Sequence, residues 1–166
     1  MAATILVALD HSPISSQVFQ EALTLAKALH TEIVLLHVLS RGAADSPNLP
    51  AMPIMDYYPD YNTSAMELFE QAWQAYEKKG MTMLNQYETV AKADGVQSQA
   101  LQIEGAPGLV ICEQAQNLDA SMIVMGRRGH TGFSELLLGS VSNYVLHHAP
   151  CTVHILNALR SDDAAR

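Results

Sequence analysis

The chain has 166 residues, of which 49% are hydrophobic and 16% are charged, and its formal net charge is −8. These values indicate a single globular domain that is long enough to bury a sizeable core. Acidic residues outnumber basic residues by 17 to 9, which argues against nucleic acid or an anionic membrane surface as the main partner. Any phosphate group must therefore be bound locally, against an unfavourable overall field.

Several other classes of protein are also disfavoured. No apolar stretch reaches the roughly 18 residues of a membrane span, and the first residues have neither the basic lead nor the apolar core of a signal peptide. Cys112 and Cys151 lie too far apart in the sequence to form a metal-ligand pair, and no two histidines have the i,i+4 spacing of a helical zinc site. We therefore expect a cytoplasmic protein with reduced thiols, a buried Cys112 and no zinc.

The first 39 residues predict a βαβ unit. Residues 4–9 and 32–39 are almost continuously apolar, as expected of parallel strands that are covered on both faces. Between them, apolar residues recur every three or four positions from Ile14 to Leu29, which predicts a helix with one apolar face. Ser12 and Pro13 predict its N-cap and first helical residue. The crossover is expected to be right-handed.

Residues 41–62 interrupt this pattern with four prolines and three tyrosines. Prolines at this density predict neither a regular helix nor a central strand, so we interpret the segment as an insertion. Two possibilities remain open for it. It is either a solvent-exposed mobile loop or a segment whose tyrosines pack on something, for instance a partner subunit.

The next segment predicts a long amphipathic helix that covers the sheet. Ser64-x-x-Glu67 forms a capping box at its start, and apolar residues continue at alternating spacings of three and four as far as Val90. The same spacing is compatible with a coiled coil. Lys78-Lys79-Gly80 resembles a helix C-terminus, so a kink or break at that point is also open.

The remaining elements complete an alternating order of strands and helices. We expect strands at 98–104, 121–125 and 151–156, and helices at about 107–116 and from 141 to 148. The order βαβαβαβαβ predicts an α/β fold, a five-stranded doubly wound parallel sheet of the Rossmann-like type. Residues 1–158 would form the single domain and residues 159–166 a polar tail.

A glycine-rich stretch between the fourth strand and the last helix is the most informative motif. Gly126 and Gly129 are followed, after nine residues, by Gly139-Ser140. Glycines in such a position let backbone N–H groups turn toward an anion, and the Ser140 hydroxyl would lie at the positive end of the helix dipole. The pattern therefore indicates a phosphate and hence a nucleotide, although a structural turn is the alternative.

The motif differs from the two common phosphate-binding sequences. A Walker loop needs a lysine, and the chain has none beyond Lys92. A dinucleotide fingerprint needs G-x-G-x-x-G, usually after the first strand. If strands one and four are neighbours at the point where the strand order reverses, Asp10 and the glycines face one cleft, which is where doubly wound sheets bind ligands.

The sequence resembles that of the universal stress protein family over nearly the whole chain. The resemblance rests on Ile5-Leu6-Val7-Ala8-Leu9-Asp10, Leu35-Leu36-His37-Val38, Gly105-x-Pro107 and Ala149-Pro150-Cys151-x-Val153. Its most specific part is Ile123-Val124-Met125-Gly126-x-x-Gly129 with Gly139-Ser140-Val141, because Gly-x2-Gly-x9-Gly-Ser matches the ATP-binding signature of that family.

The resemblance implies a domain that binds ATP and forms a homodimer through residues 151–156. The strand-one end would border the nucleotide, Val38 would flank the adenine, residues 126–129 would follow the ribose and phosphates, and residues 139–142 would hold the phosphate tail. Asp10 would contact the ribose or a phosphate-bound Mg²⁺; alternatively, it caps the first helix beside Ser12. The expected nucleotide-binding residues are Ala8, Leu9, Asp10, Val38, Met125, Gly126, Arg127, Arg128, Gly129, Gly139, Ser140, Val141 and Ser142.

The expected function is that of an ATP-binding, nucleotide-dependent stress-response regulator with slow or no hydrolysis. The motif contains no P-loop lysine, and its only cations, Arg127 and Arg128, either reach a phosphate or remain solvated. Two alternatives remain: an ATPase or AMP-forming enzyme, and a dimeric scaffold that binds AMP or cyclic AMP. His11, after Asp10, replaces the small residue that is frequent in the family and would narrow the adenine side.

Overall fold

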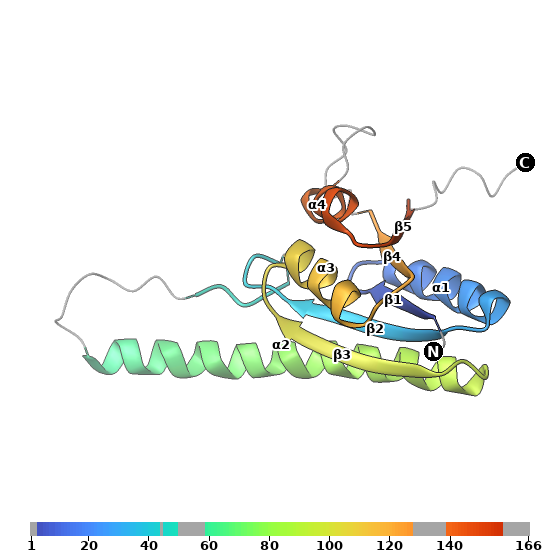
Figure 1. Ribbon diagram of the computed structural model, residues 1–166. Helices are drawn as coiled ribbons and strands as arrows, with labels where there is room; N and C mark the ends of the chain where they lie inside the picture. The colour runs from blue at the N-terminus through green and yellow to red at the C-terminus, as the bar shows by residue number, and fades with distance from the viewer. Residues whose placement is uncertain (1–2, 44, 50–58, 128–138, 158–166) are drawn as a thin grey trace, which may run out of the picture.

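The computed structural model describes residues 3–43, 45–49, 59–127 and 139–157. Its centre is a five-stranded sheet in which every pairing is parallel and the strand order is β3-β2-β1-β4-β5 (Figure 1). The strands are β1 (Thr4–Ala8), β2 (Glu32–Leu39), β3 (Ser98–Glu104), β4 (Met122–Gly126) and β5 (Thr152–Leu156). The predicted fold class, a doubly wound parallel α/β sheet, is confirmed.

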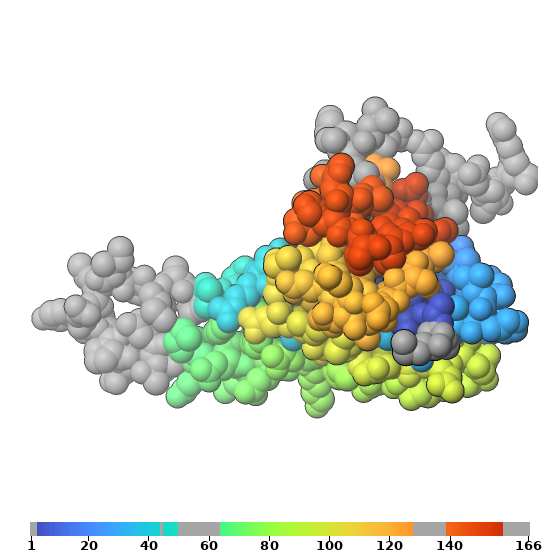
Figure 2. All heavy atoms as spheres, viewed as in Figure 1, coloured from blue at the N-terminus to red at the C-terminus, as the bar shows by residue number. Residues whose placement is uncertain are grey.

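Helices cover both faces of the sheet. The helices are α1 (Ser15–Leu29), α2 (Pro59–Ala93), α3 (Pro107–Asn117) and α4 (Ser140–His148). Helices α1 and α2 pack on one face, and α3 and α4 pack on the other, where their atoms form a continuous surface (Figures 1 and 2). The first part of α2 extends beyond the end of the sheet (Figure 1).

The alternation of side chains along the strands builds two apolar cores. Ile5 and Val7 of β1 face α1 and α2, whereas Leu6 between them faces α3 and α4, and all three are fully buried. This arrangement explains why the central strand β1 is apolar without interruption from Ile5 to Ala8, because helices cover both of its faces. Cys112 of α3 is buried in the second core, as predicted, and burial together with the neighbouring Cys151 raises the pKa of its thiol.

The predicted start of the first helix is wrong. Helix α1 begins at Ser15, and its N-cap is Ile14, which makes no side-chain cap hydrogen bond. The Ser12 hydroxyl and the Ser12 backbone N–H both donate to the Asp10 carboxylate, so this serine holds the preceding turn instead of capping the helix.

The start of the long helix was also predicted wrongly. Helix α2 begins at Pro59, so residues 59–62 of the expected insertion are helical and Ser64 lies inside the helix, not at its N-cap. Proline is compatible with the first helical position because the N–H that it lacks has no acceptor within the helix at that position. Pro50, Pro53, Tyr57 and Tyr58 lie outside the described residues, as does the tail from residue 158.

Helix α2 continues through Gly80 without a break. A Cβ atom at this position would lie 2.5 Å from Nδ1 of His37 and 2.8 Å from Nε2 of Gln102. Gly80 is therefore a point of close approach between the helix and the sheet, not a helix end. His37 is buried in its strand, whereas His154 on β5 keeps a side chain that is 41% exposed and lies 3.6 Å from the Glu21 carboxylate.

Within the described residues, no helix has both the length and the apolar character needed to cross a bilayer. The described part of the chain also contains no group of three or more histidine, cysteine or acidic side chains that are placed to hold a metal ion.

The strand order places the reversal point between β1 and β4. Strand β1 pairs with β2 on one side and with β4 on the other, and the crossovers that leave these strands run to opposite faces of the sheet. The connections that leave the carboxyl ends of these two strands therefore diverge and leave room for a ligand. Strand β5 lies at the edge of the sheet next to β4.

Candidate functional site

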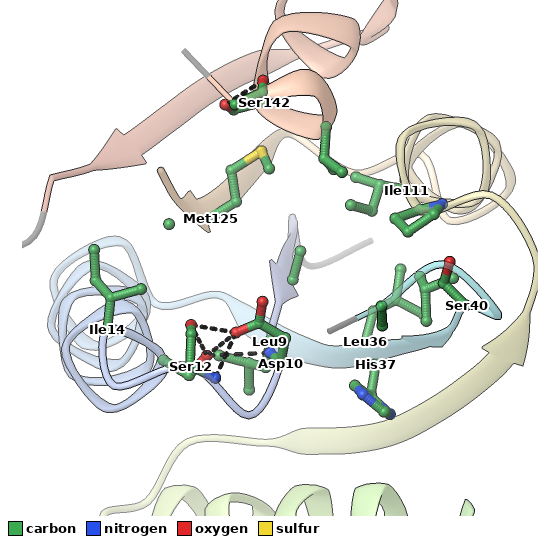
Figure 3. A pocket seen from close by; sticks show the side chains of 18 of the residues that line it. Leu9, Asp10, Ser12, Ile14, Leu36, His37, Ser40, Ile111, Met125 and Ser142 are labelled. Carbon is green, nitrogen blue, oxygen red and sulfur yellow. Dashed lines mark hydrogen bonds between the residues drawn. The ribbon is translucent and has the colours of Figure 1, made fainter. Parts of the chain in front are cut away.

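A pocket of about 310 Å³ lies at the carboxyl ends of β1, β2 and β4 (Figure 3). The ends of these strands form its base, and the first residues of α3 and α4 lie over it (Figure 3). The loop from β1 to α1 and the segment after β2 complete its walls. The pocket thus occupies the reversal point of the sheet, which is the usual place for a ligand in this class of fold.

Most of the predicted nucleotide-binding residues come together in this pocket, although they derive from four separate parts of the chain. Those that line it are Ala8, Leu9, Asp10, Val38, Met125, Gly126, Gly139, Ser140, Val141 and Ser142. Arg127 follows β4, and its backbone N–H donates to the Leu156 carbonyl at 2.8 Å, but it is not among the lining residues. Arg128 and Gly129 lie outside the described residues.

Asp10 organises the turn that follows β1. Its Oδ1 atom accepts hydrogen bonds from the Ser12 backbone N–H at 2.9 Å, from the Ser12 hydroxyl and from the Ser15 hydroxyl at 2.9 Å. The other carboxylate oxygen points toward the open pocket (Figure 3). Asp10 therefore has the expected structural role in the turn, and its geometry also allows it to accept a hydrogen bond from a ligand.

The N-terminus of α4 forms the opposite side of the pocket. Gly139 is the N-cap residue, and the Ser142 hydroxyl donates to its carbonyl oxygen at 3.0 Å, so this hydroxyl serves the helix. Ser140 is the first helical residue, lines the pocket and is exposed. The orphan N–H groups of a first helical turn attract anions, which makes this side of the pocket suitable for a phosphate.

Gly126 ends β4 at a point where α1 passes very close. A Cβ atom there would lie 2.8 Å from Cγ2 of Ile14 and 3.3 Å from Cγ2 of Val18. The absence of a side chain at Gly126 thus has a packing reason, independent of any phosphate. Both Gly126 and Ile14 line the pocket, so this contact fixes the distance between two of its walls.

The segment that follows β2 forms a wall that sequence reasoning missed. We call residues 40–46 the strap; residue 44 lies outside the described residues. Arg41 Nε lies 3.2 Å from the Glu104 Oε1 atom, and its guanidinium carbon lies 5.5 Å from the centre of the Trp73 ring. The buried Ser46 hydroxyl donates to the carbonyl of Arg41 at 3.0 Å. The strap is therefore fastened to β3 and to α2.

Two histidines and a tyrosine form a cluster next to Asp45 of the strap. The His11 ring centre is 5.2 Å from that of His37, and the Tyr76 ring lies 6.0 Å from His37. Burial, reinforced by the ammonium group of Lys79, lowers the pKa of His11, although Asp45 and Asp10 oppose this effect. His37 and Tyr76 line the pocket, whereas His11 does not. His11 can therefore narrow the adenine side of the pocket only through the residues that it contacts.

Some of the pocket residues that were not predicted could have been found from their positions after the strands. Ser40 and Asp45 follow the apolar run of β2, whose carboxyl end meets those of β1 and β4 at one edge of the sheet. Pro107 and Ile111 stand at the start of α3 and follow β3 in the same way. Tyr76 gave no such signal, because its place in the pocket depends on where α2 crosses the sheet.

The family is established by comparison with known proteins. Residues 1–157 match the model of the universal stress protein family, so the chain belongs to that family. Among curated relatives, Universal stress protein Sll1388 of Synechocystis is 31% identical over 152 residues, covering 92% of this chain and 96% of the relative. Universal stress protein Slr1101 of the same organism is 44% identical over 95 residues, covering 57% and 88%.

Solved structures with sequence identities of 18–21% share the fold. One is a universal stress protein family protein from Arabidopsis thaliana with AMP bound (TM-score 0.61, 21% identity, 98% of both chains covered). Another is the Archaeoglobus fulgidus universal stress protein in complex with dAMP (0.55, 18%, 92% of this chain and 96% of that chain). A third is a universal stress protein in complex with cAMP (0.60, 20%, 94% and 97%).

Proposed function

We propose that this protein binds an adenine nucleotide in the pocket at the carboxyl ends of β1, β2 and β4 and acts as a nucleotide-dependent regulator in the cytoplasmic stress response. The observation that carries the proposal is the position of this pocket: it lies at the reversal point of the sheet, with the N-terminus of α4 on one side. Phosphate affinity follows from the helix N-terminus, and nucleoside affinity from the apolar walls that include Val38 and Ile111.

ATP with Mg²⁺ is the ligand that the sequence motif favours. In this proposal Gly139 and Ser140 hold the phosphates, and Asp10 contacts the ribose or the metal ion. Arg127, Arg128 and Gly129 would complete the phosphate end of the site. The metal, when bound, would neutralise phosphate charge. Asp10 is suited to hold the metal because one carboxylate oxygen accepts from three donors in the turn, whereas the other points into the pocket (Figure 3).

AMP or cyclic AMP is the second candidate ligand. It is favoured because the similar solved structures include complexes with AMP, dAMP and cAMP. Mass spectrometry of the ligand that co-purifies with the native protein distinguishes the candidates, since ATP, AMP and cyclic AMP differ in mass. A protein that is purified without any nucleotide and binds none on addition would contradict the proposal as a whole.

We expect ATP hydrolysis to be slow or absent. Arg127 and Arg128 are the only cations of the glycine-rich motif, and no residue is assigned as the base for an attacking water. An arginine accelerates phosphoryl transfer strongly only when the attacking water is also positioned. Turnover should lie far below the roughly 1–100 s⁻¹ of kinases. Release of radiolabelled phosphate from ATP in the presence of Mg²⁺ measures it. Sustained turnover near one per second that is lost in Asp10→Asn would instead make the protein an enzyme.

We further propose a homodimer that forms through β5. This strand is an edge of the sheet and carries partly exposed Val153 and Ile155, and an unpaired edge tends to recruit another strand. Leu156 accepts from Arg127 at the end of β4, so alternate residues of β5 face β4 and the backbone N–H of Ile155 faces the free edge. Ile155→Pro removes this edge donor and should shift the protein from dimer toward monomer in sedimentation velocity. A wild-type protein that sediments as a monomer at tens of micromolar would contradict the proposal.

A further inference from the structure

The order of the strands assigns a direction to a ligand in the pocket. The carboxyl ends of β4, β1 and β2 lie side by side in that order. The N-terminus of α4 follows β4 in the chain, Asp10 lies in the turn after β1, and the strap follows β2, and all three line the pocket. A nucleotide is built in the linear order phosphate, ribose and base. If its phosphate lies at α4 and its ribose at Asp10, the base lies on the β2 side, next to the strap.

The strap presents a carboxylate to that side of the pocket. Asp45 lines the pocket, and its side chain is only 33% exposed. Its Oδ2 atom lies 3.7 Å from Nζ of Lys79 and 3.9 Å from Nε2 of His11. Both distances exceed that of a hydrogen bond, so among the described residues this carboxylate has charge partners but no hydrogen-bond donor.

Asp45 lies next to an ordered turn of the strap. Buried Ser46, the residue after it, donates to the carbonyls of Arg41 and Ala43. The Arg41 contacts with Glu104 and Trp73 are exposed and add little to this order. A polar group beside an ordered turn discriminates between ligands better than a mobile one, because ordering it costs little when the ligand binds.

We propose that Asp45 is a specificity determinant that accepts a hydrogen bond from the exocyclic amine of the nucleotide base, and so selects a 6-aminopurine over a 6-oxopurine. This inference rests on the proposed function. In AMP the 6-amino group is a donor that meets an acceptor. In inosine monophosphate (IMP), which differs at this edge by a carbonyl, oxygen would face carboxylate oxygen, and a desolvated contact between two acceptors is unfavourable.

The test compares AMP with IMP by isothermal titration calorimetry. The wild-type protein should bind AMP at least about 10-fold more tightly than IMP, since polar mismatches in a binding site discriminate strongly. Asp45→Asn should bring the two affinities within about 3-fold of each other, because an amide can donate to the 6-oxo group as well as accept. Asp94→Asn, a matched change at the exposed Lys27 ion pair, should leave the preference unchanged.

Two further measurements distinguish base recognition by Asp45 from a role in fastening the strap and from a contact with the ribose. Lys79→Met removes the cation nearest to Asp45 but keeps the carboxylate, so this variant should still prefer AMP to IMP. Loss of the preference in Lys79→Met would mean that Asp45 acts only by fastening the strap. The ratio of affinities for AMP and 2′-deoxyAMP should be the same in wild type and Asp45→Asn. A change in that ratio would place Asp45 at the ribose and overturn the inference.

The remaining outcomes are also decisive. If wild type binds AMP but Asp45→Asn keeps the full preference over IMP, the inference is wrong and the proposed function stands. If wild type binds AMP and IMP equally, Asp45 does not read the base. If wild type binds neither nucleotide, the proposed function itself fails.

Discussion

Ser140→Glu is expected to lower the affinity for AMP by about 100-fold, equivalent to about 2.7 kcal/mol. Ser140 is the exposed first residue of α4 and lines the pocket. A carboxylate at this position would occupy the anion site at the helix N-terminus and repel the phosphate, and like charges brought together in an interface cost several kcal/mol. The fold should be retained, since an acidic residue in the first turn stabilises a helix.

Two controls isolate the effect of the charge. Ser140→Gln has a similar size without the charge, so it should lose much less affinity than Ser140→Glu. Asn143→Glu adds the same charge to an exposed position of α4 that does not line the pocket, and it should change the affinity by less than about 3-fold. A folded Ser140→Glu variant with wild-type affinity would show that the phosphate does not lie at α4.

Gly80→Ala is expected to destabilise the protein by about 1–3 kcal/mol, the usual cost of overpacking a core. At an unconstrained helix position the same change would stabilise by about 1 kcal/mol. Here the new methyl group would lie 2.5 Å from Nδ1 of His37, which is 2% exposed and has little room to move. The sign of the change in urea-induced unfolding free energy therefore decides whether α2 packs this closely.

A double-mutant cycle with His37→Ala identifies the clash. Once the imidazole is removed, Gly80→Ala should become neutral or stabilising, and the difference between the two backgrounds measures the coupling. An equal destabilisation by Gly80→Ala in both backgrounds would mean that another contact, such as that with Gln102, limits the approach.

The sheet could be predicted because its signals are local. Apolar runs such as residues 4–9 mark strands that are covered on both faces, and the alternation with amphipathic helices implies parallel order. The adjacency of the first and fourth strands was a condition of the predicted site, since alternation alone does not fix the strand order. The structure meets this condition and brings Ala8, Asp10 and Gly126 to one edge of the sheet.

The errors arose where tertiary contacts decide the local structure. Ser12 has the sequence of an N-cap, but its hydroxyl donates to Asp10 instead. Gly80 has the sequence of a helix end, but it serves the packing of α2 against His37. Residues 41–46 of the strap were treated as part of the 41–62 insertion because of the prolines that follow them from Pro47 on. The contacts of Arg41 with Glu104 and Trp73 join segments far apart in the chain, so no local pattern predicts them.

The most direct test of adenine nucleotide binding is a calorimetric titration of the nucleotide-free, full-length protein with ATP in the presence of Mg²⁺, and with AMP. We expect saturable binding near one nucleotide per chain with a Kd below about 1 mM, which corresponds to about −4.1 kcal/mol or better. Binding should be competitive between the two ligands and strongly weakened in Ser140→Glu. A protein that is folded by circular dichroism yet gives no binding heat with either nucleotide, and no thermal stabilisation in their presence, would contradict the account.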